Sequence, residues 1–246
     1  MDRREAILRE LNLYPQWISR ASAARIAPQP PAATATDPGA MVTAGQIQQA
    51  SAAPAAGGGT ELGKLGWAEL KQRVRDCTVC KLRAGCTQTV FGVGDEKADW
   101  LFVGEGPGAD EDIRGEPFVG QAGKLLDNML MAIKLKRGSN VYIANIVKCR
   151  PPGNRNPEAD EIAACMPYLQ RQIELIQPKL IVALGKVASN ALLGREATLA
   201  SLRGKVHDYR GVKLIVTYHP AYLLRSPAEK AKAWQDLCMA VDIMNG

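Results

Sequence analysis

Four short apolar runs alternate with helix-length segments in this chain, and that alternation limits its fold more than any other feature. The runs are ADWLFVGEG, NVYIANIVK, PKLIVALG and VKLIVTYHP, and each is rich in Val, Ile or aromatic residues. Segments such as GKLLDNMLMAIK and PEADEIAACMPYLQRQIELI lie between them. Strands that alternate with helices form a parallel sheet with helices on both faces. The sequence therefore predicts an α/β domain.

Unusual polar residues follow three of these runs, at residues 104–112, 145–156 and 219–225. In open parallel sheets, ligands bind beyond the carboxyl ends of the strands. The three segments are therefore expected to meet and form a ligand site.

The size and charge of the chain narrow its class. Its 246 residues are 46% hydrophobic, which suits one well-buried domain with an appendage. The formal charge of +6 is compatible with a phosphate-bearing partner without requiring one. The start, MDRREAILRELNLYPQW, is charged and lacks the apolar region of a signal peptide, and no stretch approaches the roughly 20 apolar residues of a membrane span. We expect a cytoplasmic protein without a membrane contact.

Composition divides the chain into three parts. Residues 1–20 predict a short amphipathic helix, either a docking peptide or a weakly packed tail. Residues 21–60 are Ala, Pro and Gly-rich, a composition typical of a disordered linker because it cannot bury enough apolar surface to offset the entropy of ordering. Residues 61–246 carry the α/β pattern and form the predicted catalytic domain.

The first strand is followed by GEGPGADED, whose glycines suggest a phosphate loop. The acids of this segment would repel a phosphate, and the Lys-Ser/Thr pair of a Walker loop is missing. The glycines are better suited to bring backbone N–H groups near a small neutral ligand or a water. The alternative is a tight turn before an acidic helix start. In PFVG, which comes next, Phe118 is either a core residue or a stacking platform for a base, worth about 1–3 kcal/mol.

Asn145 and His219 each stand at the end of an apolar run. The Asn145 side chain offers an acceptor and a donor in one plane, which match uracil N3–H and O4 and oppose the pattern of cytosine, although an Asn here can also be a cap or turn residue. His219 would face the ligand and donate a hydrogen bond to an oxygen that gains negative charge. In AYLLRSP, Leu223 and Leu224 suit an apolar wedge in a base stack and Arg225 a phosphate contact, or else the leucines start a helix and belong to the core.

Six cysteines in a reducing compartment predict metal ligation or burial in preference to disulfides. They are Cys77, Cys80, Cys86, Cys149, Cys165 and Cys238. The first two form a C-x-x-C, a spacing that lets both thiolates meet one metal centre. No second C-x-x-C follows, so Cys149 and Cys165 are the expected partners, and this spread favours an iron–sulfur cluster over zinc. Cys86 competes as the fourth ligand, whereas Cys238 is expected in the core.

The loops together resemble a known family. GEGPGADED, PFVG, NIVKCRPPGNRNP and HPAYLLR, in this order and with C-x-x-C upstream, are similar to the family 4 uracil-DNA glycosylases, a bacterial and archaeal branch of the superfamily. The resemblance covers about residues 65–230. It implies a three-layer α/β/α fold with a four-stranded parallel sheet, excision of uracil from single- and double-stranded DNA, and a [4Fe–4S] cluster with a structural role.

The resemblance also assigns roles within the base site. It implies that Phe118 stacks on uracil, Asn145 recognises its Watson–Crick edge, and His219 faces its O2 atom. Glu111 matches an acid that crowds the C5 side, where thymine carries a methyl group, and Asn154 matches an active-site asparagine. The implied cluster ligands are Cys77, Cys80, Cys149 and Cys165.

The reaction implied is base excision by a monofunctional hydrolase. The N-glycosidic bond breaks through an oxocarbenium-like state, the uracil anion is stabilised by His219 and Asn145, and water attacks C1′ to leave an abasic site. Glu105 and Gly106 resemble the pair that places the water. The glycosylases best known for water activation place an Asp in the first loop, where this chain has GEGPG, so Glu105, Glu111 and backbone placement stay open as alternatives.

Base flipping costs a few kcal/mol, which contacts to the DNA must offset. The expected DNA-binding residues are Lys148, Arg150, Arg155, Leu223, Leu224 and Arg225. We expect the enzyme to act as a monomer.

A second resemblance concerns the N-terminus. LRELNLYPQWISR is similar to the peptide by which the ψ subunit of the bacterial replication clamp loader docks onto its partner. It implies a clamp-loader contact through residues 1–20, with Trp17 as the anchor.

Two other functions compete with the enzyme. One is a protein that binds or traps uracil-DNA without efficient turnover, as relatives with a His in an Arg-rich insertion do, but GNRNP in the corresponding loop contains no His. The other is an iron–sulfur electron carrier or redox sensor, which would not need Asn145 or Phe118.

Overall fold

A computed structural model describes residues 62–246, so the predicted N-terminal helix and linker lie outside the described residues. The described elements are α3 (Trp67–Arg75), α4 (Leu82–Gly85), β1 (Val93–Gly94), β2 (Trp100–Gly104), α5 (Ala109–Arg114), α6 (Gln121–Ala132), β3 (Val141–Asn145), η1 (Pro152–Asn154), α7 (Ala159–Ile176), β4 (Leu180–Leu184), α8 (Lys186–Leu193), α9 (Leu199–Leu202), β5 (Val206–Tyr209), β6 (Val212–Thr217), α10 (Pro220–Arg225), η2 (Pro227–Glu229) and α11 (Lys230–Asn245).

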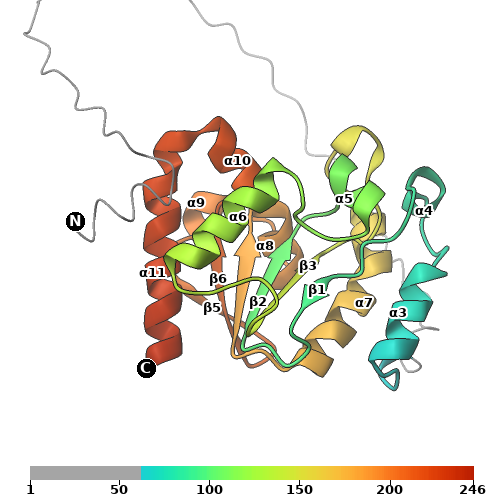
Figure 1. The fold of residues 1–246 in the computed structure, drawn as a ribbon, viewed down its shortest axis with the longest axis horizontal. Helices are drawn as coiled ribbons and strands as arrows, with labels where there is room; N and C mark the ends of the chain where they lie inside the picture. The colour runs from blue at the N-terminus through green and yellow to red at the C-terminus, as the bar shows by residue number, and fades with distance from the viewer. Residues whose placement is uncertain (1–61) are drawn as a thin grey trace, which may run out of the picture. The chain divides into compact units, whose positions relative to one another are not determined.

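The sheet has six strands in the order β1-β3-β2-β4-β6-β5 (Figure 1). The four predicted apolar runs form β2, β3, β4 and β6, and these are mutually parallel. The prediction of four strands was wrong in number, because β1 and β5 add one antiparallel strand at each edge. The class predicted from the alternation is confirmed.

Helices cover both faces of the sheet, and alternate strand residues divide the core into two clusters. On one face Leu101 and Val103 of β2 pack with residues of α3, α7, α8 and α9. On the other, Trp100 and Phe102 pack with residues of α6, α10 and α11. The predicted three-layer arrangement is confirmed (Figure 1).

The parallel register places the functional loops at one edge. Gly104 at the end of β2 is level with Asn145 at the end of β3, and Leu184 of β4 is level with Thr217 of β6. The segments that follow these strands therefore leave the sheet together.

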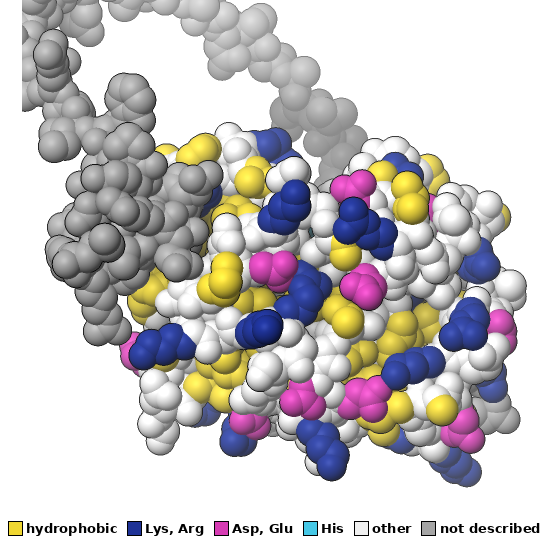
Figure 2. Space-filling model, viewed as in Figure 1, with side chains coloured by type: hydrophobic (Ala, Val, Ile, Leu, Met, Phe, Trp, Pro, Cys, Tyr) yellow, Lys and Arg dark blue, Asp and Glu magenta, His cyan; other side chains and the backbone are white. Residues whose placement is uncertain are grey.

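The surface of the described domain mixes both signs of charge. Lys and Arg side chains are interspersed with Asp and Glu over the face shown in Figure 2. Within residues 62–246, none of the helices combines the length and the apolar character needed to cross a bilayer.

Candidate active site

A cavity opens at the carboxyl edge of the sheet, where the three predicted loops meet. Its lining includes all seven residues expected at the base site: Glu105, Gly106, Glu111, Phe118, Asn145, Asn154 and His219. Asn145 is the last residue of β3, and the others come from the segments after β2, β3 and β6. The structure thus brings together residues that are up to about a hundred positions apart in the sequence.

Asn145 provides an unpaired acceptor in this cavity. The residue is 2% exposed, and its Oδ1 atom has no hydrogen-bond partner within residues 62–246. A buried carbonyl oxygen without a donor is costly, and such a group calls for a ligand that supplies one. Gly104 makes room for it, since a Cβ atom there would lie 2.5 Å from Asn145 Oδ1.

Phe118 forms an apolar wall beside Asn145. It is buried and has a positive φ of 57°, which is rare for a bulky residue. Its ring centroid lies 5.4 Å from that of His219, with the planes tilted by 31°. A Cβ atom on Gly104 would lie 2.6 Å from Phe118 Cζ, so the absence of a side chain at Gly104 leaves room for both Asn145 and Phe118.

His219 is the N-cap of α10 and is held as a neutral donor. Its Nδ1 atom accepts a hydrogen bond from the Ala221 N–H at 3.2 Å, which leaves the proton on Nε2. The pKa of His219 is lowered to about 4, mainly by burial and to a smaller extent by the charge of Arg225, while Glu111 opposes the shift. At neutral pH the ring therefore offers one N–H without a positive charge.

The Glu111 carboxylate ties two of the pocket loops together. One oxygen accepts from the N–H groups of Val119 at 2.9 Å and Gly120 at 3.1 Å, and the other accepts from Gly108 N–H at 3.1 Å. The predicted role was to crowd a ligand, and the structure adds this structural role. Glu105 differs, because it is partly buried and burial raises its pKa.

Two predicted DNA contacts do not fit the structure. Lys148 is 1% exposed, and its ammonium group donates to Asn145 O at 2.9 Å and to Gln172 Oε1 at 2.6 Å. Leu223 is 1% exposed and packs in the core between α6 and α11, so the alternative of a core leucine holds. Leu224, by contrast, is 44% exposed, which leaves it as the wedge candidate.

The three predicted arginines lie around the cavity in different states. Arg225 is exposed and lines the cavity. Arg150 donates from Nε to Asn154 Oδ1 at 2.7 Å, so it supports a lining residue. Arg155 lines the cavity as well, but its guanidinium is largely engaged inside the protein.

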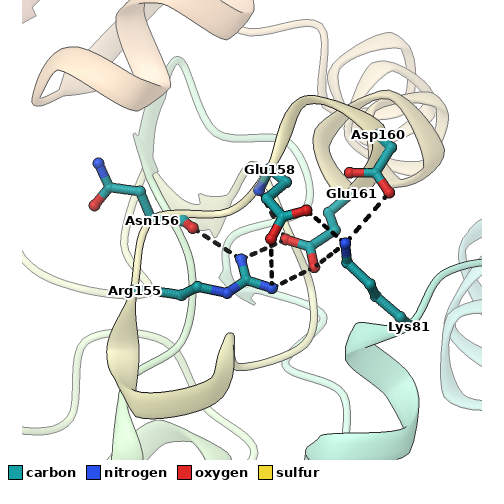
Figure 3. Close-up of polar contacts among 6 residues, drawn as sticks. All are labelled: Lys81, Arg155, Asn156, Glu158, Asp160 and Glu161. Carbon is teal, nitrogen blue, oxygen red and sulfur yellow. Dashed lines mark hydrogen bonds and ion pairs between the residues drawn. The ribbon is translucent and has the colours of Figure 1, made fainter.

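Figure 3 shows what engages Arg155. Its guanidinium donates to both oxygens of Glu161, at 2.8 and 2.7 Å, and to Asn156 O at 2.9 Å. Lys81, just after the C-x-x-C, reaches Glu158 and Glu161 from the other side. The Arg155 hydrogen bonds hold the pKa of Glu161 at about 2. This network joins the cavity loop, the start of α7 and the segment before α4, and the sequence analysis missed it.

Four cysteines share a second, small cavity between α3, α4 and α7. Cys77, Cys80, Cys149 and Cys165 line it, as predicted for cluster ligands. Lys148 N–H donates to Cys165 Sγ at 3.2 Å and Tyr168 OH to Cys77 Sγ at 3.3 Å, contacts that suit thiolate ligands.

Cys86 does not line that cavity but is a neighbour of Cys149, so its competition is not removed. Within residues 62–246, no three His, Cys, Asp or Glu side chains form a group that could hold a metal ion as they stand.

Tyr222 is a further cavity residue that the sequence analysis did not single out. It is 40% exposed and stacks on Tyr218 with ring centroids 5.3 Å apart. An aromatic within AYLLR, two residues before the exposed Leu224, was the signal that could have indicated it.

Comparisons with known proteins agree with this geometry. The family model of the uracil DNA glycosylase superfamily matches residues 91–238 of this chain. A type-4 uracil-DNA glycosylase of Archaeoglobus fulgidus is 45% identical over 65% of this chain and 83% of its own length. Those of Pyrobaculum aerophilum (42%; 70% of this chain, 91% of the relative) and Thermotoga maritima (44%; 66% and 85%) are similar. This chain therefore belongs to the uracil-DNA glycosylase superfamily, and within it to the type-4 enzymes.

Proposed function

We propose that this protein hydrolyses the N-glycosidic bond of deoxyuridine in DNA, releasing uracil and leaving an abasic site for base excision repair. The observation that carries the proposal is the buried, unpaired Oδ1 atom of Asn145 beside Phe118 and His219. Uracil N3–H is the donor this acceptor lacks. Cytosine has no hydrogen on N3 and leaves the acceptor unpaired there.

The geometry supports a leaving-group mechanism. Phe118 provides the stacking face for a flipped base, and Nε2–H of His219 is available to donate to uracil O2 as negative charge builds up. A neutral imidazole suits this role, because it stabilises the anion without transferring a proton to it. The bond then breaks through an oxocarbenium-like state.

Attack of water on C1′ completes the reaction, and Glu105 is the favoured group to place it. Both oxygens of Glu111 accept backbone hydrogen bonds, which leaves that carboxylate less available. Burial raises the pKa of Glu105, and a carboxylate with a raised pKa is a better acceptor for a water proton.

We further propose that Cys77, Cys80, Cys149 and Cys165 hold a structural [4Fe–4S] cluster. Each thiolate of such a cluster binds its own iron, so the ligands can stand farther apart than those of a single ion. The cluster would fix the segment that runs from Asn145 to Cys149. Iron and sulfide content with visible absorbance should be present in the wild type, lost in Cys165→Ser and kept in Cys86→Ser. Zinc in place of iron would refute the assignment.

The DNA partner is proposed to include both single- and double-stranded forms, with Arg225 of the cavity lining and the exposed Leu224 as contacts. The protein would act in the cytoplasm as a monomer. For residues 1–20 we propose the clamp-loader contact anchored by Trp17. Unchanged capture of clamp-loader subunits after deletion of these residues would refute that contact.

The test of function is strand cleavage after alkali treatment of a labelled oligonucleotide with one deoxyuridine, single-stranded or paired with guanine. We expect cleavage by the wild type, a loss of at least about a hundred-fold in His219→Ala and Asn145→Ala, and normal cleavage by His207→Ala. His207 is the matched control, because its ring is hydrogen-bonded to Leu202 O and neither residue lines the cavity. DNA binding without turnover by the wild type would instead support a uracil-DNA binding or trapping protein.

A further inference from the structure

Phe118, the wall of the base cavity, has a backbone conformation that its own residue type disfavours. Its φ of 57° lies in the left-handed region, where a bulky side chain is uncommon. Such a conformation persists only where the surrounding structure enforces it. The contacts that enforce it here therefore decide the orientation of the stacking surface.

Arg137 makes those contacts from outside the cavity. Its guanidinium donates to Pro117 O and to Phe118 O, both at 2.8 Å, and its Nε atom donates to Asp127 at 3.0 Å. A planar fork that binds two successive carbonyls fixes the peptide between them, which a single-point donor cannot do.

The neighbouring residues complete the enclosure. Glu111 accepts the N–H groups of Val119 and Gly120, so the PFVG segment is bound on its next two amides as well. Gly123 lets α6 approach the carbonyl that Arg137 binds, since a Cβ atom there would lie 1.8 Å from Phe118 O. Arg137 itself does not line the cavity, so any effect that it has on a base is indirect.

We propose that Arg137 is a positioning residue for uracil recognition, holding Phe118 at the angle at which its ring stacks on the flipped base. The inference rests on the proposed function. It predicts a defect in base binding that leaves contacts with the rest of the DNA intact.

Arg171 offers a matched control. Like Arg137 it binds a backbone carbonyl and an acid: its Nε atom donates to Leu65 O at 2.9 Å, and its guanidinium donates to Glu174 at 3.0 Å. Its side chain is 17% exposed against 22% for Arg137. Removal of Arg171 therefore costs a similar set of contacts at a site remote from the stacking ring.

The experiment measures inhibition by free uracil, affinity for abasic-site DNA and the melting temperature. In Arg137→Ala we expect inhibition by uracil to weaken by about ten-fold or more, the range that loss of one stacked base implies, with abasic-DNA affinity changed less than about two-fold. Arg171→Ala should leave both constants unchanged. Equal behaviour of the two variants in uracil inhibition would overturn the proposal.

A double-mutant cycle tests the route through the ring. If Arg137 acts through Phe118, Phe118→Ala and the double variant Phe118→Ala/Arg137→Ala should bind uracil equally weakly, whereas additive losses would refute that route. If Arg137→Ala does not fold, inhibition of Arg137→Lys by free uracil tests the proposal instead. A lysine reaches one carbonyl at a time and should give an intermediate loss, and wild-type inhibition by uracil in that variant would overturn the proposal. A wild type that cleaves no deoxyuridine would instead refute the proposed function.

Discussion

His219 should remain neutral far below the pH at which an exposed histidine is protonated. Its pKa of about 4 compares with an ordinary value of 6.5, and burial is the main cause. The difference is worth roughly 3 kcal/mol between the two protonation states. Between these two pH values the unfolded chain binds a proton that the folded chain refuses. The free energy of unfolding therefore falls as pH drops from about 6.5 to 4, by up to that amount.

The chain has two histidines, so NMR of the imidazole groups can test this directly. His207→Gln and His219→Gln assign the two signals. We expect the His219 signal to stay unchanged from pH about 8 to 5, and single-turnover cleavage to show no ionisation of this ring over that range. The melting temperature of the wild type should fall more steeply below pH 6.5 than that of His219→Gln. A His219 signal that titrates near 6.5 would refute the neutral-donor argument.

Three further changes follow from the geometry. Gly104→Ala places a Cβ atom 2.5 Å from Asn145 Oδ1, so we expect the variant to lose uracil release and to be less stable by about 1–3 kcal/mol. Wild-type cleavage by this variant would contradict the close contact at Gly104. Glu161→Gln replaces the buried carboxylate that accepts two Arg155 hydrogen bonds and should lower stability by about 1–3 kcal/mol in urea unfolding, whereas unchanged stability would show that the network is dispensable. Leu224→Ala should keep its melting temperature but slow cleavage of duplex more than of single-stranded DNA, and equal slowing would exclude a wedge.

The base site could be predicted because its residues stand at strand ends. The alternation of apolar runs fixed which strands are parallel, and parallel strands end at one edge. Asn145 and His219 follow such runs directly, so their meeting depends on topology alone. The unpaired state of Asn145 Oδ1 depends on the packing of Gly104 and Phe118, which a one-dimensional pattern does not contain.

The wrong predictions concern the direction of side chains on loops and short helices. Lys148 is charged and stands two residues before Arg150, which favoured an exposed position. Its ammonium group is nevertheless buried because Asn145 O and Gln172 Oε1 accept its hydrogen bonds, and Gln172 is 24 residues away in the sequence. Leu223 and Leu224 are neighbours of the same residue type, and the orientation of α10 about its own axis decides which of them is exposed.

The two edge strands also bear on self-association. A parallel sheet that ended in β3 and β6 would expose long rows of unpaired N–H and C=O groups, which readily pair with a second chain. Here β1 covers one edge with two residues, and β5 covers the other with four residues that include the exposed Asp208. Short or charged outer strands are poor templates for strand addition. The sheet of the described domain should therefore resist pairing with the sheet of a second chain, even at high protein concentration.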